Sequence, residues 1–130
     1  MSSNLTEEEN MFILEDLKGQ WLHSIEGLYK GSDMVTLNTT DGRYKFYHEQ
    51  DCCETVDLYD FDGEAKDVKD SIIFSIEEVN GESVVEEDEC FDSTTWTFYK
   101  IETSRGGIFM RWLGASNGYY SEEVSYCKIN

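Results

Sequence analysis

The sequence predicts an α+β fold in which a short N-terminal helix precedes a mainly antiparallel β-sheet of about seven strands. Two observations predict it. A capping pattern followed by helically spaced apolar residues stands near the start, and β-rich runs separated by turn dipeptides fill the rest. Because 130 residues is close to the commonest domain size, residues 1–130 are expected to form a single domain.

The helix is expected over residues 7–18. Thr6 and Glu9 fit a capping box, in which a hydroxyl and a carboxylate three residues later satisfy the first amides of a helix. Apolar residues with roughly helical spacing follow, and these are Met11, Phe12, Leu14 and Leu17. Gly19 stands where a glycine often ends a helix.

Strands are expected wherever β-branched and aromatic residues alternate with polar ones between turn signals. The runs cover residues 21–26, 34–39, 43–48, 55–61, 72–79, 94–103, 108–113 and 119–129. Dipeptides that favour tight hairpins separate them, at residues 41–42, 62–63, 80–81, 106–107 and 117–118. Residues 65–70 could form one helical turn, and both a curled sheet and an open barrel are compatible with these runs.

The negative charge is concentrated in the middle of the chain. The net charge is −18, and residues 49–92 hold 17 carboxylates against two lysines. Such a surface repels nucleic acid and anionic lipid, so basic protein surfaces or cations are the expected partners. No apolar stretch is long enough to span a membrane and no secretory signal is visible, which predicts a cytosolic protein.

The segment from His48 to Glu54 contains the residue types of a metal or acid/base site. His48 and Cys52 are separated by three residues, so a turn could bring them together as zinc ligands, with Cys90 as a further candidate. A cysteine–histidine nucleophile is conceivable, but the nearby carboxylates would raise the thiol pKa. A turn capped by Asp51 is the simpler interpretation. The cytosolic setting predicts reduced, mostly buried cysteines, although four cysteines permit two disulfides.

Three segments carry a resemblance. Residues 42–54, which end in His-Glu-Gln-Asp-Cys-Cys-Glu, resemble a family of small uncharacterised proteins encoded by bacteriophages and related mobile elements. Residues 96–100 and 111–121 are similar to the closing strands of that family. The resemblance covers most of residues 17–125 and implies a phage origin and a setting in the host cytoplasm. It implies no activity and no catalytic residues.

Charge and resemblance together favour a binding protein over an enzyme. The leading hypothesis is a phage-encoded inhibitor without a cofactor, which mimics nucleic acid and occupies the basic groove of a host defence protein such as a CRISPR effector or a restriction enzyme. The expected contact residues are Asp57, Asp60, Asp62, Glu64, Glu86, Glu87, Asp88 and Glu89. The alternatives are a metal-dependent ligand-binding or catalytic module centred on His48 and Cys52, and a phage structural or assembly protein.

Overall fold

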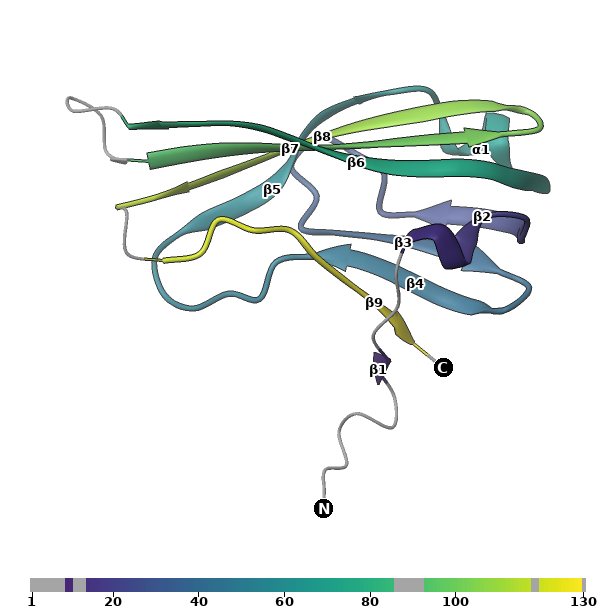
Figure 1. Ribbon diagram of the computed structural model, residues 1–130, viewed down its shortest axis with the longest axis horizontal. Coiled ribbons are helices and arrows are strands. Elements are labelled where there is room, and N and C mark those ends of the chain that lie inside the picture. Colours follow the sequence, from purple (N-terminus) through teal and green to yellow (C-terminus); the bar gives the residue numbers. More distant parts are fainter. Residues whose placement is uncertain (1–8, 11–13, 86–92, 118–119, 130) are drawn as a thin grey trace, which may run out of the picture.

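Nine antiparallel strands form one sheet in the part of the protein that the structure describes. The computed structural model describes residues 9–10, 14–85, 93–117 and 120–129. The sheet order is β1-β9-β4-β3-β2-β6-β7-β8-β5 (Figure 1). The strands are β1 (Glu9–Asn10), β2 (Trp21–Glu26), β3 (Met34–Thr39), β4 (Gly42–Tyr47), β5 (Thr55–Asp62), β6 (Ser71–Val85), β7 (Ser93–Thr103), β8 (Gly106–Ser116) and β9 (Ser125–Ile129).

The predicted α+β class is wrong, because the described residues contain too little helix for it. In place of a helix over residues 7–18, the two-residue strand β1 pairs with β9, and Leu14–Leu17 forms a single 3₁₀ turn. A short helix is marginal in water without packing, and here strand pairing and the burial of Leu17 outweigh the helical pattern. Residues 7–8 and 11–13 lie outside the described part of the chain. The fold is therefore all-β.

The antiparallel sheet and the short helical turn are confirmed, the latter as α1 (Ala65–Val68). One detail differs from the sequence prediction. Asn80 and Gly81 do not form a hairpin turn, because they lie inside the long strand β6 beside an irregularity in its pairing with β7. Within the described residues, the end strands β1 and β5 do not pair with each other, so the sheet does not close into a barrel.

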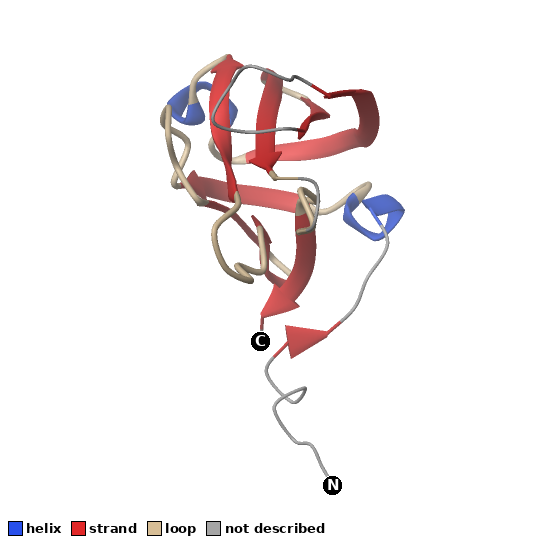
Figure 2. Cartoon of the chain, turned by 90° about the vertical axis from the view of Figure 1, so that its left-hand side faces the viewer, coloured by secondary structure: helices blue, strands red, loops and turns tan. Residues whose placement is uncertain are grey.

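The sheet bends into two layers between β2 and β6. These strands share only the pairs Trp21↔Ile72 and Leu22↔Ser71. We call β1-β9-β4-β3-β2 the first half-sheet and β6-β7-β8-β5 the second half-sheet. The two half-sheets stack face to face, as Figure 1 and the perpendicular view in Figure 2 show.

The core lies between the two half-sheets. Phe46 of β4 meets Tyr99 of β7 edge to face, with ring centroids 4.9 Å apart, and Tyr126 of β9 contacts both rings. Other fully buried side chains come from both layers, among them Leu22, Val35, Leu37, Leu58, Ile73, Ile101, Met110 and Trp112. Since side chains alternate along a strand, burying one face of each layer leaves the other face for solvent or a partner.

We predict that Phe46→Ala destabilises the fold by about 3–5 kcal/mol, because it opens a cavity where the two half-sheets meet. The neighbouring Tyr47 is half-buried on the opposite face of β4, so Tyr47→Ala should cost less than about 1 kcal/mol. Urea unfolding of both variants measures the difference. Equal losses would contradict the assignment of Phe46 to the interface between the layers.

Candidate functional site

The outer face of the second half-sheet, which is the face directed away from the core, holds three of the predicted contact residues. On β8, Ile108, Met110 and Trp112 are buried, so Phe109, Arg111 and Leu113 point outward. Their β5 partners in the strand pairing are Asp57 opposite Leu113, Asp60 opposite Arg111 and Asp62 opposite Phe109. All three aspartates therefore lie on one outer face.

A β-bulge brings these aspartates together. Strict alternation from the buried Leu58 would place Asp60 and Asp62 on the inner face, away from Asp57. The pairing of β5 with β8 instead shifts between Leu58 and Asp60, which leaves Tyr59 as the extra residue. The shift turns Asp60 and Asp62 outward and Phe61 inward, where it packs against the core.

Arg111 binds two of the aspartates. Its Nη1 lies 3.2 Å from Asp60 Oδ1, and its Nη2 donates to Asp62 Oδ2 at 2.6 Å. The guanidinium carbon also lies 5.1 Å from the centroid of the Phe109 ring, within the range of a cation–π contact. One guanidinium on this face is thus held by carboxylates and by an aromatic ring together.

The other predicted contact residues are placed differently. Glu64 follows β5 and pairs with Lys66 of α1 at 3.4 Å, with both side chains well exposed. Such a surface pair contributes little to stability. The predicted acidic run Glu86, Glu87, Asp88 and Glu89 lies outside the described residues.

Asp57 is close to a second carboxylate. Partial burial raises the pKa of Asp57, and the negative charge of Asp33 raises it further. Asp33 belongs to the loop between β2 and β3, and this loop also meets the edge of β5, where the amide of Gly31 donates to the Leu58 carbonyl at 2.7 Å. In the described part of the chain, no lysine or arginine forms an ion pair with Asp57.

Four aromatic side chains form a row across the same outer face. Tyr59 and Trp96 have ring centroids 5.2 Å apart, Trp96 and Phe98 6.1 Å, and Phe98 and Phe109 5.7 Å. We call these four residues the aromatic row. Tyr59 is 54% exposed and the other three are half-buried, so the row is open to a partner.

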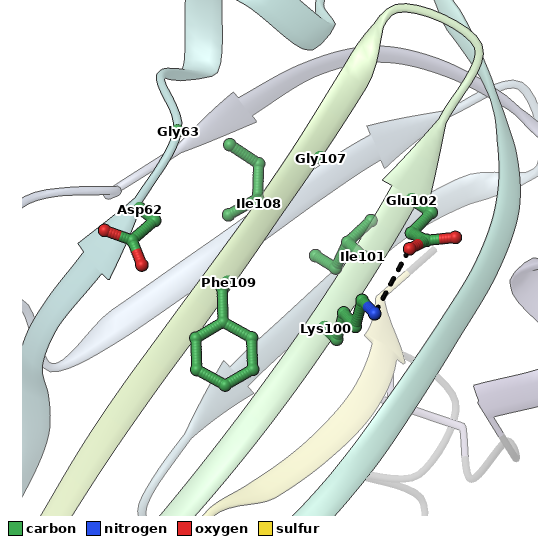
Figure 3. A pocket seen from close by; sticks show the side chains of 8 residues that line it. All are labelled: Asp62, Gly63, Lys100, Ile101, Glu102, Gly107, Ile108 and Phe109. Carbon is green, nitrogen blue, oxygen red and sulfur yellow. Dashed lines mark ion pairs between the residues drawn. The ribbon is translucent and has the colours of Figure 1, made fainter.

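A hollow of about 380 Å³ lies at one end of the aromatic row (Figure 3). Gly107 of β8 lies in its lining, where an added Cβ would come within 3.2 Å of the carbonyl oxygen of Ile101. Asp62 lies to one side of Gly107 and Glu102 to the other, and Phe109 lines the hollow as well. Lys100 also lines it and pairs with Glu102 at 3.3 Å. The hollow is therefore flanked by carboxylates and an aromatic ring.

The predicted motif from His48 to Glu54 forms a buried polar clamp. His48 Nε2 donates to Glu54 Oε2 at 2.7 Å, and His48 Nδ1 donates to the carbonyl oxygen of Glu123 at 2.7 Å. Both ring nitrogens of His48 are therefore engaged within the protein. The side chains of His48 and Glu54 are 4% and 0% exposed.

Glu54 organises the loop between β4 and β5. Its carboxylate accepts hydrogen bonds from the amides of Asp51 and Cys52, at 2.7 and 2.9 Å. Burial alone would raise the pKa of Glu54, but the bonds from His48 and the two amides outweigh it and lower the pKa to about 2. The capped turn that the sequence predicts is therefore present, with Glu54 rather than Asp51 as the capping side chain.

The clamp does not offer the expected metal ligands. His48 uses both ring nitrogens within the protein, and Cys52 forms a disulfide with Cys53. Among the described residues there is no group of three or more His, Cys, Asp or Glu side chains suited to a metal ion. Cys90 lies outside those residues. The disulfide also removes the Cys52 thiol that a cysteine nucleophile would need.

The prediction of reduced, mostly buried cysteines is correct for Cys127 and wrong for Cys52 and Cys53. Cys127 is buried and free of any disulfide. Cys52 and Cys53 are exposed in the loop between β4 and β5 and are joined to each other. Placement in an exposed loop, rather than on a strand with alternating faces, is what brings the two sulfurs together.

Sequence reasoning missed the aromatic row, the role of Arg111 and the role of Glu54. The alternation of residues 96, 98 and 100 indicates that they share one face of a strand, but it does not indicate whether that face points toward the core or away from it. The outward direction of Arg111 could have been inferred from its alternation with Met110 and Trp112. The bulge in β5 has no clear signal in the sequence.

We predict that Glu54→Gln lowers the stability at neutral pH and weakens its dependence on acid. A carboxylate with a lowered pKa stabilises the fold above its ordinary value of 4.5, and this contribution is lost as the pH falls toward about 2. The variant lacks that contribution at every pH. Urea unfolding between pH 7 and pH 2.5 (about the range of the transition) should therefore show the two proteins converging in acid.

Glu123→Gln is the matched control, because the side chain of Glu123 is exposed and only its backbone carbonyl meets His48. It should leave the stability and its pH dependence close to those of the unmodified protein. A constant difference between Glu54→Gln and the unmodified protein across the whole pH range would contradict the assigned ionisation of Glu54.

Comparison with known proteins gives a family and no function. Residues 15–126 match the model of a family described as a domain of unknown function, DUF7448. No curated protein and no solved structure matches the chain. Within the described residues, no helix is both long and apolar enough to cross a membrane. Because the family model covers most of its length, the chain belongs to the DUF7448 family.

Proposed function

We propose that the protein is a non-enzymatic binding protein that uses the carboxylates of its second half-sheet to bind the basic surface of a nucleic-acid-binding protein. The observation that carries the proposal is the bulge in β5, which turns Asp60 and Asp62 onto the outer face that Asp57 already occupies. A rigid strand holds alternate side chains about 7 Å apart, so the negative charges have set positions. A disordered acidic tail would not keep its charges at fixed positions.

The physical logic is competition with nucleic acid. Duplex DNA carries one negative charge per about 1.7 Å of its axis, and proteins that bind it present matching lysines and arginines. A folded surface with a net charge of −18 is attracted to such a track and repelled by nucleic acid itself. The attraction weakens as salt screens the charges.

More specifically, we propose a phage-encoded inhibitor that acts in the cytoplasm of a bacterial host. Its target would be a defence protein that binds nucleic acid, such as a CRISPR effector or a restriction enzyme. The support is the charge together with the resemblance of residues 42–54 to phage-encoded proteins. The clamp of His48 and Glu54 has a structural role in this proposal, since both side chains are buried and paired.

We predict that neutralising the outer face weakens capture of nucleic-acid-binding proteins by about tenfold, since each exposed charge pair contributes about 0.2–1 kcal/mol. The variant is Asp57→Asn, Asp62→Asn and Glu64→Gln. The immobilised protein is incubated with bacterial lysate at low and high salt, and bound proteins are identified by mass spectrometry. Duplex DNA should release them, because it competes for the same basic surface.

The matched control is Glu15→Gln, Glu26→Gln and Asp41→Asn, which also removes three charges, from exposed positions in the 3₁₀ turn, in β2 and in the turn between β3 and β4. It should retain the captured proteins. Two results would contradict the proposal: no nucleic-acid-binding protein retained at low salt, or equal losses for both variants. Equal losses would mean that total charge matters and its placement does not.

A further inference from the structure

We propose that the outer face of the second half-sheet binds arginine side chains of the partner, with guanidinium groups stacking on the aromatic row and pairing with the β5 carboxylates. This inference rests on the proposed function and names the chemistry of the partner surface. A lysine-rich track of equal charge would satisfy the proposed function and not this inference.

The first argument is the composition of the face. Carboxylates alone would suffice for electrostatic attraction, yet this face also presents Tyr59, Trp96, Phe98 and Phe109 in contact with one another. Val79, which is 48% exposed and pairs with Phe98 across β6 and β7, extends the apolar surface. Contiguous exposed apolar surface of this kind marks an interaction site.

The second argument is Arg111, an internal example of the proposed contact. Its guanidinium stacks on Phe109 at one end of the row while Asp60 and Asp62 bind its two terminal nitrogens. The spacing between the row and β5 therefore suits a guanidinium in both modes at once. Carboxylate and ring together select a planar cation.

The third argument is the end of the row opposite to Arg111. Tyr59 and Trp96 lie there, and Asp57 is two residues from Tyr59 on the same strand. Asp57 has Asp33 as its charged neighbour in place of a cation, and partial burial together with the negative charge of Asp33 raises the pKa of Asp57. A guanidinium from a partner would relieve this repulsion as Arg111 does for Asp60 and Asp62.

The hollow beside Gly107 gives room for a second partner side chain. Asp62 and Glu102 flank it and Phe109 lines it (Figure 3), so its chemistry repeats that of the Arg111 contact. Lys100 already pairs with Glu102, so an incoming cation must share that carboxylate. The two positions lie on either side of Arg111, which suits a segment carrying several arginines.

Arginine fits this face better than lysine or a nucleobase. A guanidinium is planar, is weakly hydrated and donates two parallel hydrogen bonds to a carboxylate, whereas an ammonium is a compact, strongly hydrated charge. Nucleobases also stack on aromatic rings, but their phosphates would be repelled by the aspartates beside the row. Charge complementarity therefore favours an arginine-rich protein segment.

The test compares a short homopolymeric arginine peptide with a lysine peptide of the same length, both titrated calorimetrically into the full-length protein at moderate salt. The arginine peptide should bind about fivefold more tightly, which is the upper range of one exposed cation–π contact. In the double variant Tyr59→Ala, Trp96→Ala this preference should disappear, so that the two peptides bind with about equal affinity. Tyr47→Ala, on the outer face of the first half-sheet, should keep it.

Tyr59→Ala alone covers the case in which the double variant does not fold, because Tyr59 is 54% exposed. It should reduce the preference for arginine by at least about twofold. Equal affinity of the unmodified protein for both peptides would overturn the inference, and so would a preference that survives Tyr59→Ala.

A different result would contradict the proposed function. It is contradicted if the variant that neutralises Asp57, Asp62 and Glu64 binds both peptides as tightly as the unmodified protein does. If that variant binds more weakly while the two peptides remain equivalent, the acidic face binds basic partners and the aromatic row has no part in the selection.

Discussion

The packing of the two half-sheets against each other is the constraint on which the rest of the structure depends. Phe46 and Tyr99 meet between the layers, so each strand must bury one side of its pleat and turn the other outward. That division decides which residues are available to a partner. A carboxylate on the inner face would need hydrogen-bond donors, and one on the outer face can remain charged in water.

The protein contains carboxylates of both kinds, and burial separates their roles. Glu54 is buried and accepts hydrogen bonds from His48 and two amides, so its negative charge stabilises the loop between β4 and β5. Asp57 is partly exposed beside another carboxylate, an arrangement that disfavours the folded state unless a cation approaches. Repulsion of this kind does not stabilise the fold, and a basic partner of the proposed kind would relieve it.

The sequence predicts the antiparallel sheet well because turn dipeptides and alternation are local signals. It fails at residues 7–18, where pairing of β1 with β9 joins segments that are far apart along the chain. It fails again at β5, because a bulge depends on the register with β8. For the same reason, the motif from His48 to Glu54 resembles a metal site in the sequence, and only the contact with Glu123 reveals the clamp.

The bulge in β5 connects these points. Without it, Asp60 and Asp62 would point toward the apolar core, where their charges would have to be neutralised, and Arg111 would lose both partners on the outer face. An unbulged strand with apolar residues at the inner positions would avoid this cost. A bulge that instead turns Asp60 and Asp62 onto the face that carries Asp57 and the aromatic row places charge and stacking surface side by side. Solubility would require only the charge, so the rings beside it support the proposed recognition of a cation that can also stack.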